Sequence, residues 1–216
     1  MSCSQCQGIE RVFDSKLARR ELRFYRWFGP RKSTALLLQL LEPLATSKSL
    51  LDIGGGIGVI QHELYRSGLH RSMQVDGASA YIKVSREESR RRGHENRCEY
   101  RHGDFVDLAA EDVDIKADLV SLDRVICCYP GMEELLGAAA DRASRVVGLV
   151  FPRDGRLFQI IERVGNLFVR FFDPDYRMYI HSAKDVEELM RNRGFSRKAL
   201  RKTVAWQVHL YERVAH

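Results

Sequence analysis

The sequence predicts an α/β fold built on a doubly wound, parallel sheet. From residue 49 onward, short apolar runs alternate with stretches of helical length, which is typical of parallel strands joined by helices. The chain has 216 residues, of which 44% are hydrophobic, and this size suits one sizeable core. No internal repeat interrupts the pattern. We therefore expect a single domain over residues 1–216.

Two helices are expected ahead of the sheet. Residues 9–26 carry apolar side chains at loosely helical spacing. The stretch "GPRKST" at 29–34 interrupts this pattern, and Ser33 or Thr34 is suited to cap a helix over residues 35–41 that Pro43 ends. Residues 1–44 are therefore predicted to form an N-terminal helical cap.

The alternation then predicts the remaining elements in turn. Gly68 and Gly93 mark the ends of two helices, and Ser182 with Asp185 forms a capping pattern that starts a third. Apolar side chains that alternate between residues 204 and 210 indicate a final strand. The other expected strands are residues 49–53, 72–76, 97–101, 117–123 and 145–152, and the expected helices are residues 59–68, 79–93, 132–144 and 182–194.

The net charge of +6 is unevenly distributed. Residues 11–32 contain eight basic and two acidic side chains, residues 191–202 contain six basic and no acidic ones, and residues 103–118 are strongly acidic. Basic ends suit an anionic substrate, an RNA or an anionic membrane surface. An ordinary solvated surface is the alternative interpretation.

Neither a membrane span nor a metal site is predicted. The longest apolar runs, at residues 35–38 and 146–151, are far shorter than the roughly 20 residues that span a bilayer. The first residues have no apolar core of the signal-peptide kind, so a cytoplasmic protein is expected. Five cysteines are expected to be thiols, and the pair Cys3 and Cys6 lacks a second ligand pair.

The most informative stretch is "LLDIGGGIG" at residues 50–58. Asp52 ends an apolar strand, and glycines follow at 54, 55, 56 and 58. The dinucleotide fingerprint G-x-G-x-x-G fails because Val59 stands where its third glycine belongs, and no lysine follows to make a nucleoside-triphosphate loop. No role is assigned to Gly55.

The remaining pattern, D-x-G-x-G-x-G, resembles the first motif of the class I S-adenosylmethionine-dependent methyltransferases. Further motifs follow in that family's order: "VDGAS" at 75–79, "GDF" at 103–105 and "LVSLDRV" at 119–125. The resemblance covers about residues 49–151. It implies a Rossmann-like, seven-stranded, mostly parallel sheet and an enzyme that takes S-adenosylmethionine as its cofactor.

The resemblance also implies cofactor contacts. The methionine end would approach the backbone at residues 54–58, where a Cβ would collide. Asp76 would accept both ribose hydroxyls, and Asp104 would accept from the adenine amino group while Phe105 packs on the ring. A helix cap is the alternative for Asp76, and an ordinary turn for Asp104. The expected cofactor-binding residues are Asp52, Gly54, Gly56, Gly58, Asp76, Asp104, Phe105, Asp123 and Arg31.

The methyl acceptor is less defined. The sequence "DRVICCYP" stands after the fourth strand in place of N/D-P-P-Y/F, which argues against methylation of nucleic-acid bases. His181 and Tyr129 are the candidate catalytic residues, although His181 also suits a surface or capping role and Cys127 a core thiol. The expected substrate-facing residues are Tyr25, Arg124, Cys127 and Phe168.

A helical insert over residues 152–181 is expected to bear on the acceptor. Its apolar side chains form a broad face, and Arg156, Arg163 and Arg170 recur every seven residues. Three interpretations of this insert are open: a lid over a large substrate, a helix that contacts anionic lipid, or a helix that simply packs on the protein. The region also resembles the magnesium-protoporphyrin O-methyltransferases, which implies O-methylation of a bulky or acidic small molecule. An RNA methyltransferase and a non-catalytic cofactor-binding protein are the alternatives, and the sequence does not predict an oligomeric state.

Overall fold

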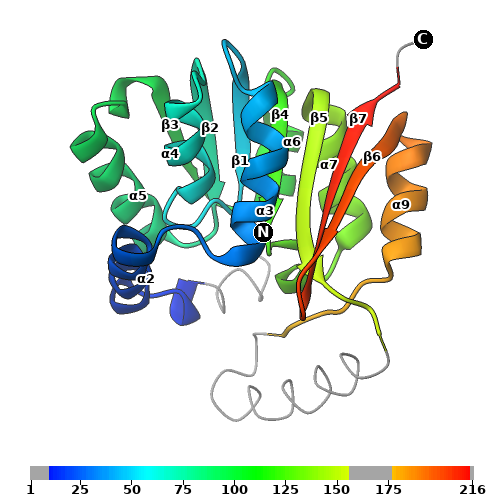
Figure 1. The fold of residues 1–216 in the computed structure, drawn as a ribbon, viewed down its shortest axis with the longest axis horizontal. Coiled ribbons are helices and arrows are strands. Elements are labelled where there is room, and N and C mark those ends of the chain that lie inside the picture. Colours follow the sequence, from blue (N-terminus) through cyan, green and yellow to red (C-terminus); the bar gives the residue numbers. More distant parts are fainter. Residues whose placement is uncertain (1–9, 156–176, 215–216) are drawn as a thin grey trace.

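The fold is a seven-stranded sheet with helices on both faces (Figure 1). The structure is a computed structural model that describes residues 10–155 and 177–214. The strands lie in the order β3-β2-β1-β4-β5-β7-β6. β1 to β5 are parallel, and β7 runs antiparallel to both of its neighbours. The strands are β1 (Ser49–Ile53), β2 (Arg71–Asp76), β3 (Cys98–His102), β4 (Ala117–Asp123), β5 (Ala143–Pro152), β6 (Phe195–Lys202) and β7 (Trp206–Arg213).

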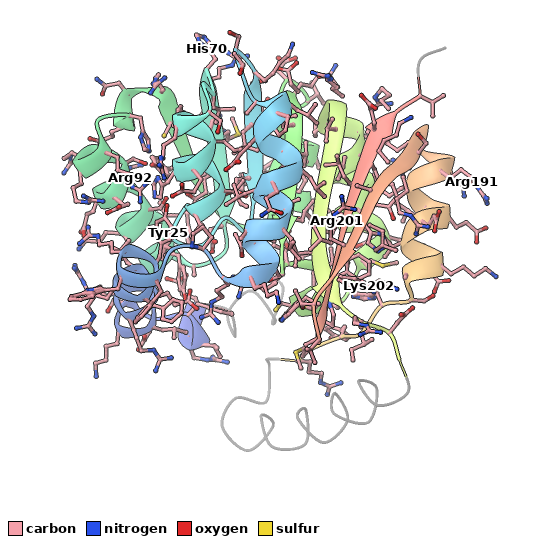
Figure 2. All side chains as sticks on the ribbon, viewed as in Figure 1. Tyr25, His70, Arg92, Arg191, Arg201 and Lys202 are labelled. Atoms are coloured by element: carbon pink, nitrogen blue, oxygen red, sulfur yellow. The ribbon has the colours of Figure 1, made fainter. Side chains whose placement is uncertain are left out.

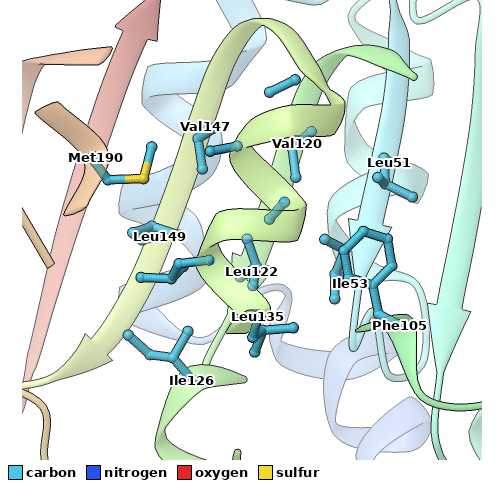
Figure 3. Close-up of a cluster of buried hydrophobic side chains, with 14 of the residues drawn as sticks. Leu51, Ile53, Phe105, Val120, Leu122, Ile126, Leu135, Val147, Leu149 and Met190 are labelled. Carbon is cyan, nitrogen blue, oxygen red and sulfur yellow. The ribbon is translucent and has the colours of Figure 1, made fainter. Parts of the chain in front are cut away.

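The helices divide between the two faces of the sheet. One core joins the sheet to α6, α7 and α9 (Figure 3), while α3 and α4 pack on the other face in a second core. α5 lies on the same face as α4, and α2 packs against α5 in a third cluster. The helices are α2 (Ser15–Phe28), α3 (Lys32–Leu41), α4 (Val59–Arg66), α5 (Ser79–Arg92), α6 (Phe105–Glu111), α7 (Met132–Arg142) and α9 (Ala183–Asn192), with 3-10 turns η1 (Glu42–Leu44), η2 (Glu95–Arg97) and η3 (Ile126–Cys128).

A buried glutamate fastens α2 to α5. The side chain of Glu88 is fully buried and accepts hydrogen bonds from Arg26 of α2 and from Arg91 and Arg92 of its own helix. Burial opposes the charged form of Glu88, but the three arginines outweigh it and hold the pKa of this carboxyl well below its ordinary value. Since α2 borders the carboxyl edge of the sheet, this contact positions one wall of the site described below.

The mostly parallel, doubly wound sheet is confirmed, and three local expectations need correction. The helix expected over residues 9–26 is interrupted by a bend at Phe13 and Asp14, and the Asp14 side chain caps α2 by accepting from the Leu17 N–H at 2.8 Å. α6 and β6 were not predicted at all. The region of α6 is rich in acidic residues and β6 is rich in basic ones. In both, the charged residues obscured the apolar spacing that predicts a helix or a strand.

Some expectations fall outside the described residues. These are Cys3 and Cys6, and most of the predicted insert over residues 152–181, including Phe168. Within the two described ranges, no helix is both long and apolar enough to cross a bilayer. In the same ranges, no group of three or more histidine, cysteine, aspartate or glutamate side chains is arranged to hold a metal ion.

Candidate active site

A cavity of about 310 Å³ opens at the carboxyl edge of the parallel strands. Ligand sites of open α/β sheets form at this edge, where loops leave neighbouring strands. The loops after β1, β2, β3 and β4 all contribute to the lining, and they include most of the residues expected from the sequence. Those expected residues are Gly54, Gly56, Asp76, Asp104, Phe105, Asp123, Arg124, Cys127 and Tyr129.

A smaller recess of about 70 Å³ lies against the same glycine loop. Its lining includes Tyr25 at the end of α2, Arg31 ahead of α3, and Asp52. It shares Gly54, Gly56, Asp123 and Arg124 with the larger cavity. The N-terminal helices therefore wall the site on one side.

The glycine loop turns sharply because three of its residues, Gly54, Gly56 and Gly58, adopt left-handed backbone conformations. Gly54 has φ of +61° and Gly56 has φ of +57°, a region that residues with a Cβ rarely occupy. A Cβ on Gly54 would also lie 2.6 Å from Val125 Cγ2, whereas one on Gly56 would meet nothing nearer than Tyr81 at 3.5 Å. Gly56 is therefore the glycine whose missing side chain leaves space in the cavity.

The other two glycines face the protein itself. A Cβ on Gly58 would collide with Ser85 and Gln61, and Gly58 does not line the cavity. A Cβ on Gly55 would lie 2.7 Å from Asp52 Oδ2 and 2.8 Å from Gln74 Cγ. Gly55, which had no predicted role, is thus required for the loop to pack over Asp52.

Asp52 is buried beneath this loop. Ser121 Oγ donates to its Oδ1 at 2.6 Å, while Oδ2 has no hydrogen-bond partner among the described residues. Burial raises the pKa of Asp52 to about 7, and the nearby carboxylates of Asp123 and Asp76 add to the effect. Asp52 therefore lies directly beneath the loop, where Gly55 packs over its carboxyl group.

Asp76 joins the glycine loop to the start of α5. Its Oδ2 accepts from the Gly56 N–H and its Oδ1 from the Ala78 N–H, both at 2.8 Å. Burial raises the pKa of Asp76 to about 6, although these two backbone bonds favour the charged form. Each carboxylate oxygen can accept about two hydrogen bonds, so both retain capacity toward the cavity that Asp76 lines.

Asp104 and Tyr129 meet across the cavity. The Tyr129 hydroxyl lies 3.1 Å from Asp104 Oδ1 and 3.0 Å from Oδ2. Asp104 also caps α6, where Oδ1 accepts from the Val106 N–H at 2.9 Å. Phe105 follows as the first residue of α6 and is buried in the core while its ring lines the cavity. Asp104, which the resemblance places at the adenine, is therefore hydrogen-bonded to Tyr129, a residue predicted to be catalytic.

The turn after β4 is held from two sides. Asp123 Oδ2 accepts from Thr34 Oγ1 of α3 at 2.6 Å, and its Oδ1 lies 3.2 Å from Arg124 Nε. Arg124 has φ of +63°, a conformation that costs a non-glycine residue about 1 kcal/mol or more. Its N–H donates to Val150 O at 2.9 Å. Asp123 and Arg124 therefore line the cavity together with Gly54.

Tyr25 and Arg31 are engaged by glutamates. The Tyr25 hydroxyl donates to Glu63, and both burial and this bond raise its pKa, so the phenol stays neutral. Arg31 Nη2 lies 3.0 Å from Glu21 Oε1. Arg31 is exposed, so its guanidinium keeps donors available toward the recess.

The remaining predicted residues differ in placement. Cys127 is a buried thiol whose pKa is raised by its contact with Cys128 and by burial, as expected for a core cysteine. His181 donates from Nε2 to Ile126 O at 2.8 Å and does not line the cavity. The structure therefore brings Tyr129, and not His181, to the cavity wall.

Sequence reasoning missed several apolar wall residues. Phe13, Tyr81, Val125, Leu135, Met178 and Trp206 all line the cavity. They come from elements far apart in the sequence and belong to no common motif, so only the fold unites them. Trp206 lay on the predicted apolar face of the last strand, but nothing in that alternation indicated that its ring reaches a site.

The donor set fits S-adenosylmethionine. Two carboxylates on separate loops can accept from hydroxyl and amino groups, an apolar wall between them suits a flat ring, and a cradle beside Gly56 stays open because no Cβ fills it. The cofactor implied by the sequence resemblance therefore matches the chemistry of the residues present.

Comparisons with known proteins agree with this fit. Residues 51–148 match the family model described as "Methyltransferase domain". The ribosomal protein L11 methyltransferase of Desulforamulus reducens is 25% identical over 109 residues, which are 50% of this chain and 35% of that protein. The chain thus spans about a third of the length of this curated relative.

Two solved structures share the fold over almost the whole chain. Magnesium protoporphyrin IX methyltransferase from Synechocystis PCC 6803 with bound S-adenosylhomocysteine superposes with a TM-score of 0.73 at 17% identity, over 96% of this chain and 99% of that one. A chain from the complex between the Haloferax volcanii Trm112 methyltransferase activator and a methyltransferase gives 0.72 at 14% identity, over 96% and 98%. The resemblance inferred from the motifs is confirmed. Residues 51–148 therefore form a methyltransferase domain, and the fold is that of the S-adenosylmethionine-dependent methyltransferases, whose cofactor is S-adenosylmethionine.

Proposed function

We propose that this protein transfers a methyl group from S-adenosylmethionine to an oxygen of a bulky or acidic small molecule. The observation that carries the proposal is the single cavity in which Gly56, Asp76 and Asp104 face a largely apolar wall. The fold shared with magnesium protoporphyrin IX methyltransferase supports a large, flat, acidic acceptor.

Cofactor binding is assigned to the loops after β1, β2 and β3. Asp76 accepts from the ribose hydroxyls with the capacity that its bonds to Gly56 and Ala78 leave. Asp104 accepts from the adenine amino group and Phe105 packs against the ring. Arg31 donates to the carboxylate of the methionine moiety. Each of these residues lines the cavity or its recess, and its role toward the cofactor is our assignment.

The acceptor side is assigned to the apolar wall and to Arg124. When bound, S-adenosylmethionine supplies a methyl group already activated on a sulfonium sulfur. The chain therefore mainly has to orient the acceptor oxygen and exclude water. Met178, Leu135 and Trp206 provide an apolar surface for a bulky ring system. Arg124, whose guanidinium lies 5.9 Å from the Trp206 ring centroid, supplies the positive charge for a carboxylate.

An acidic acceptor needs little proton transfer. A carboxylate is already ionised at neutral pH, so no strong base is required at the cavity. Tyr129 lines the wall and is engaged with Asp104, which suits a residue that shapes the site. The lack of a prominent general base among the lining residues is thus compatible with methyl ester formation.

Two measurements test the proposal. Calorimetry should detect binding of S-adenosylmethionine and S-adenosylhomocysteine to the wild type, and Asp76→Ala should abolish it. Asp107→Ala is the matched control, because Asp107 is an exposed carboxylate in the first turn of α6. Thermal melting of each variant separates lost binding from lost folding, and Asp76→Asn, which keeps the side-chain volume, provides a second readout.

The acceptor class is tested by label transfer. Isotope-labelled methyl groups should move from the cofactor into a small-molecule fraction of cell extract, in a form released by mild alkali as expected of a methyl ester. Magnesium protoporphyrin IX serves as one defined acceptor. Label recovered in RNA or in protein, or in an alkali-stable product, would contradict O-methylation of an acid while leaving the cofactor assignment intact.

A further inference from the structure

α2 has a second apolar face that is largely exposed to solvent. Phe24, Trp27 and Phe28 stand at spacings of three and four residues, so they share one side of the helix. Their exposed fractions are 47%, 82% and 73%. The opposite side of α2 packs on α5 through Leu22 and Tyr25. The helix therefore presents more large apolar surface than its packing uses.

The solvent side of α2 is also strongly basic. Lys16, Arg19, Arg20, Arg23 and Arg26 are all exposed. Arg19 and Arg26 pair with glutamates of α5, whereas Lys16, Arg20 and Arg23 have no ion-pair partner in the described part of the chain.

The surrounding sequence does not offset this charge. The one acidic residue within α2 is Glu21, which is half-buried and bound to Arg31. Arg31 and Lys32 extend the basic surface past the end of the helix. The outward face therefore carries a net positive charge next to its exposed aromatic side chains.

This combination matches a helix that lies in the interface of an anionic bilayer. Such helices place aromatic side chains at the headgroup boundary and flank them with lysine and arginine, and tryptophan is enriched at that depth. A single-stranded nucleic acid instead requires a basic groove with separate stacking platforms. Here the Phe24 and Phe28 rings pack on each other, 5.0 Å apart. Neither the cavity nor its recess includes Arg20, Arg23 or Trp27.

We propose that the outward face of α2 docks on an anionic lipid bilayer. Trp27 and Phe28 enter the interface, and Arg20 and Arg23 lie over the negatively charged headgroups. Because Glu21 lines the cavity and Phe24 its recess, docking holds the site against the membrane surface. This inference does not rest on the identity of the methyl acceptor.

Vesicle flotation of the full chain tests the proposal. The protein should float with vesicles of phosphatidylcholine mixed with phosphatidylglycerol, and stay behind with phosphatidylcholine alone or at high salt. The double variant Arg20→Glu with Arg23→Glu should reduce partitioning at least about twenty-five-fold, since each cation at an anionic surface contributes roughly a fivefold factor. Trp27→Ala with Phe28→Ala should reduce it as well.

A matched control lies at the other edge of the sheet. Arg201→Glu with Lys202→Glu makes the same change in net charge on β6, away from α2 (Figure 2), and should leave flotation unchanged. The tryptophan emission of the wild type should shift to shorter wavelength on binding. Trp27→Phe should remove that shift, because Trp206 then reports alone.

Three outcomes would overturn the proposal. One is no flotation with phosphatidylglycerol vesicles. Another is an equal loss of flotation in the α2 and β6 charge variants, which would show that binding depends on the net charge of the protein and not on the α2 surface. The third is that the protein does not bind vesicles but binds a single-stranded RNA oligonucleotide, or forms a dimer that Trp27→Ala with Phe28→Ala dissociates. The surface would then serve nucleic acid or a second copy of the chain.

Discussion

The hydroxyl of Tyr129 donates to the carboxylate of Asp104, at 3.1 Å from Oδ1 and 3.0 Å from Oδ2. The two residues come from different loops, one after β4 and one after β3. Their bond spans the cavity wall and fixes the orientation of a carboxylate assigned to the cofactor. A hydrogen bond to a charged group is worth about 1.5–3 kcal/mol, so this contact is strong enough to control binding.

Tyr129→Phe removes this bond and keeps the ring. We expect affinity for S-adenosylhomocysteine to fall about tenfold, because Asp104 loses its orientation, while kcat stays within about threefold once cofactor is saturating. Calorimetry and steady-state kinetics measure the two effects. A fall in kcat of about a hundredfold with unchanged affinity would show that Tyr129 acts on the acceptor, as the sequence predicted.

Gly55→Ala and Gly56→Ala should separate stability from binding. A Cβ at Gly55 meets the buried Asp52 and Gln74 side chains, so we expect a loss of about 1–3 kcal/mol in unfolding free energy. A Cβ at Gly56 would meet only Tyr81, at ordinary contact distance. Its cost is the left-handed backbone, about 1–2 kcal/mol, together with a filled cradle. Gly56→Ala should therefore abolish cofactor binding in a protein that still unfolds cooperatively. Retained binding in that variant would disprove the cradle.

Asp52→Asn should change the pH dependence of stability. The folded-state pKa of Asp52, about 7, lies above the ordinary value of 3.8, so the folded wild type binds more protons than the unfolded chain between these values. The contribution of Asp52 to wild-type stability thus decreases as pH rises through this window. The asparagine variant lacks this loss, so its stability relative to the wild type should increase from pH 4 to pH 7, by about 2–4 kcal/mol in total. Urea unfolding at four pH values measures it, and a pH-independent difference would contradict the assignment.

Glu88→Gln should weaken the attachment of α2 to α5. Removing the buried charge leaves three arginines without their shared partner, at a cost of about 2–3 kcal/mol. Because the pKa of Glu88 is lowered in the folded state, its contribution is present above about pH 4.5 and is lost as pH falls further. The difference between wild type and variant should shrink in acid. Glu87→Gln, which breaks a longer and more exposed contact with Arg19, should cost less than about 1 kcal/mol.

The parts of the site that follow from local sequence were predictable. A glycine loop after an apolar strand, and aspartates that close the next two strands, are set by positions along the chain. The parallel sheet then brings Gly56, Asp76 and Asp104 to one edge, because parallel strands share the edge at which they end. Gly58 was assigned to the cofactor site by motif alone, and a Cβ at this position would point toward Ser85 instead of the cavity.

The parts that depend on packing were not predictable. Nothing in the spacing of residues 104 and 129 indicates that their side chains meet, and the need for Gly55 arises only from Asp52 beneath it. β6 was hidden because Arg197, Lys198, Arg201 and Lys202 place charge along it. Such charge is common on edge strands, where it prevents pairing with other chains, and it masks the apolar alternation of a strand.

The position of β7 also orders events during synthesis. β6 pairs with β7 alone, while β7 pairs with both β5 and β6. β6 therefore has no strand to pair with until β7, which follows after three residues, has also been synthesised. Until then the lysines and arginines of β6 favour its solvated state. When β7 arrives, one antiparallel insertion recruits β6 and completes the sheet.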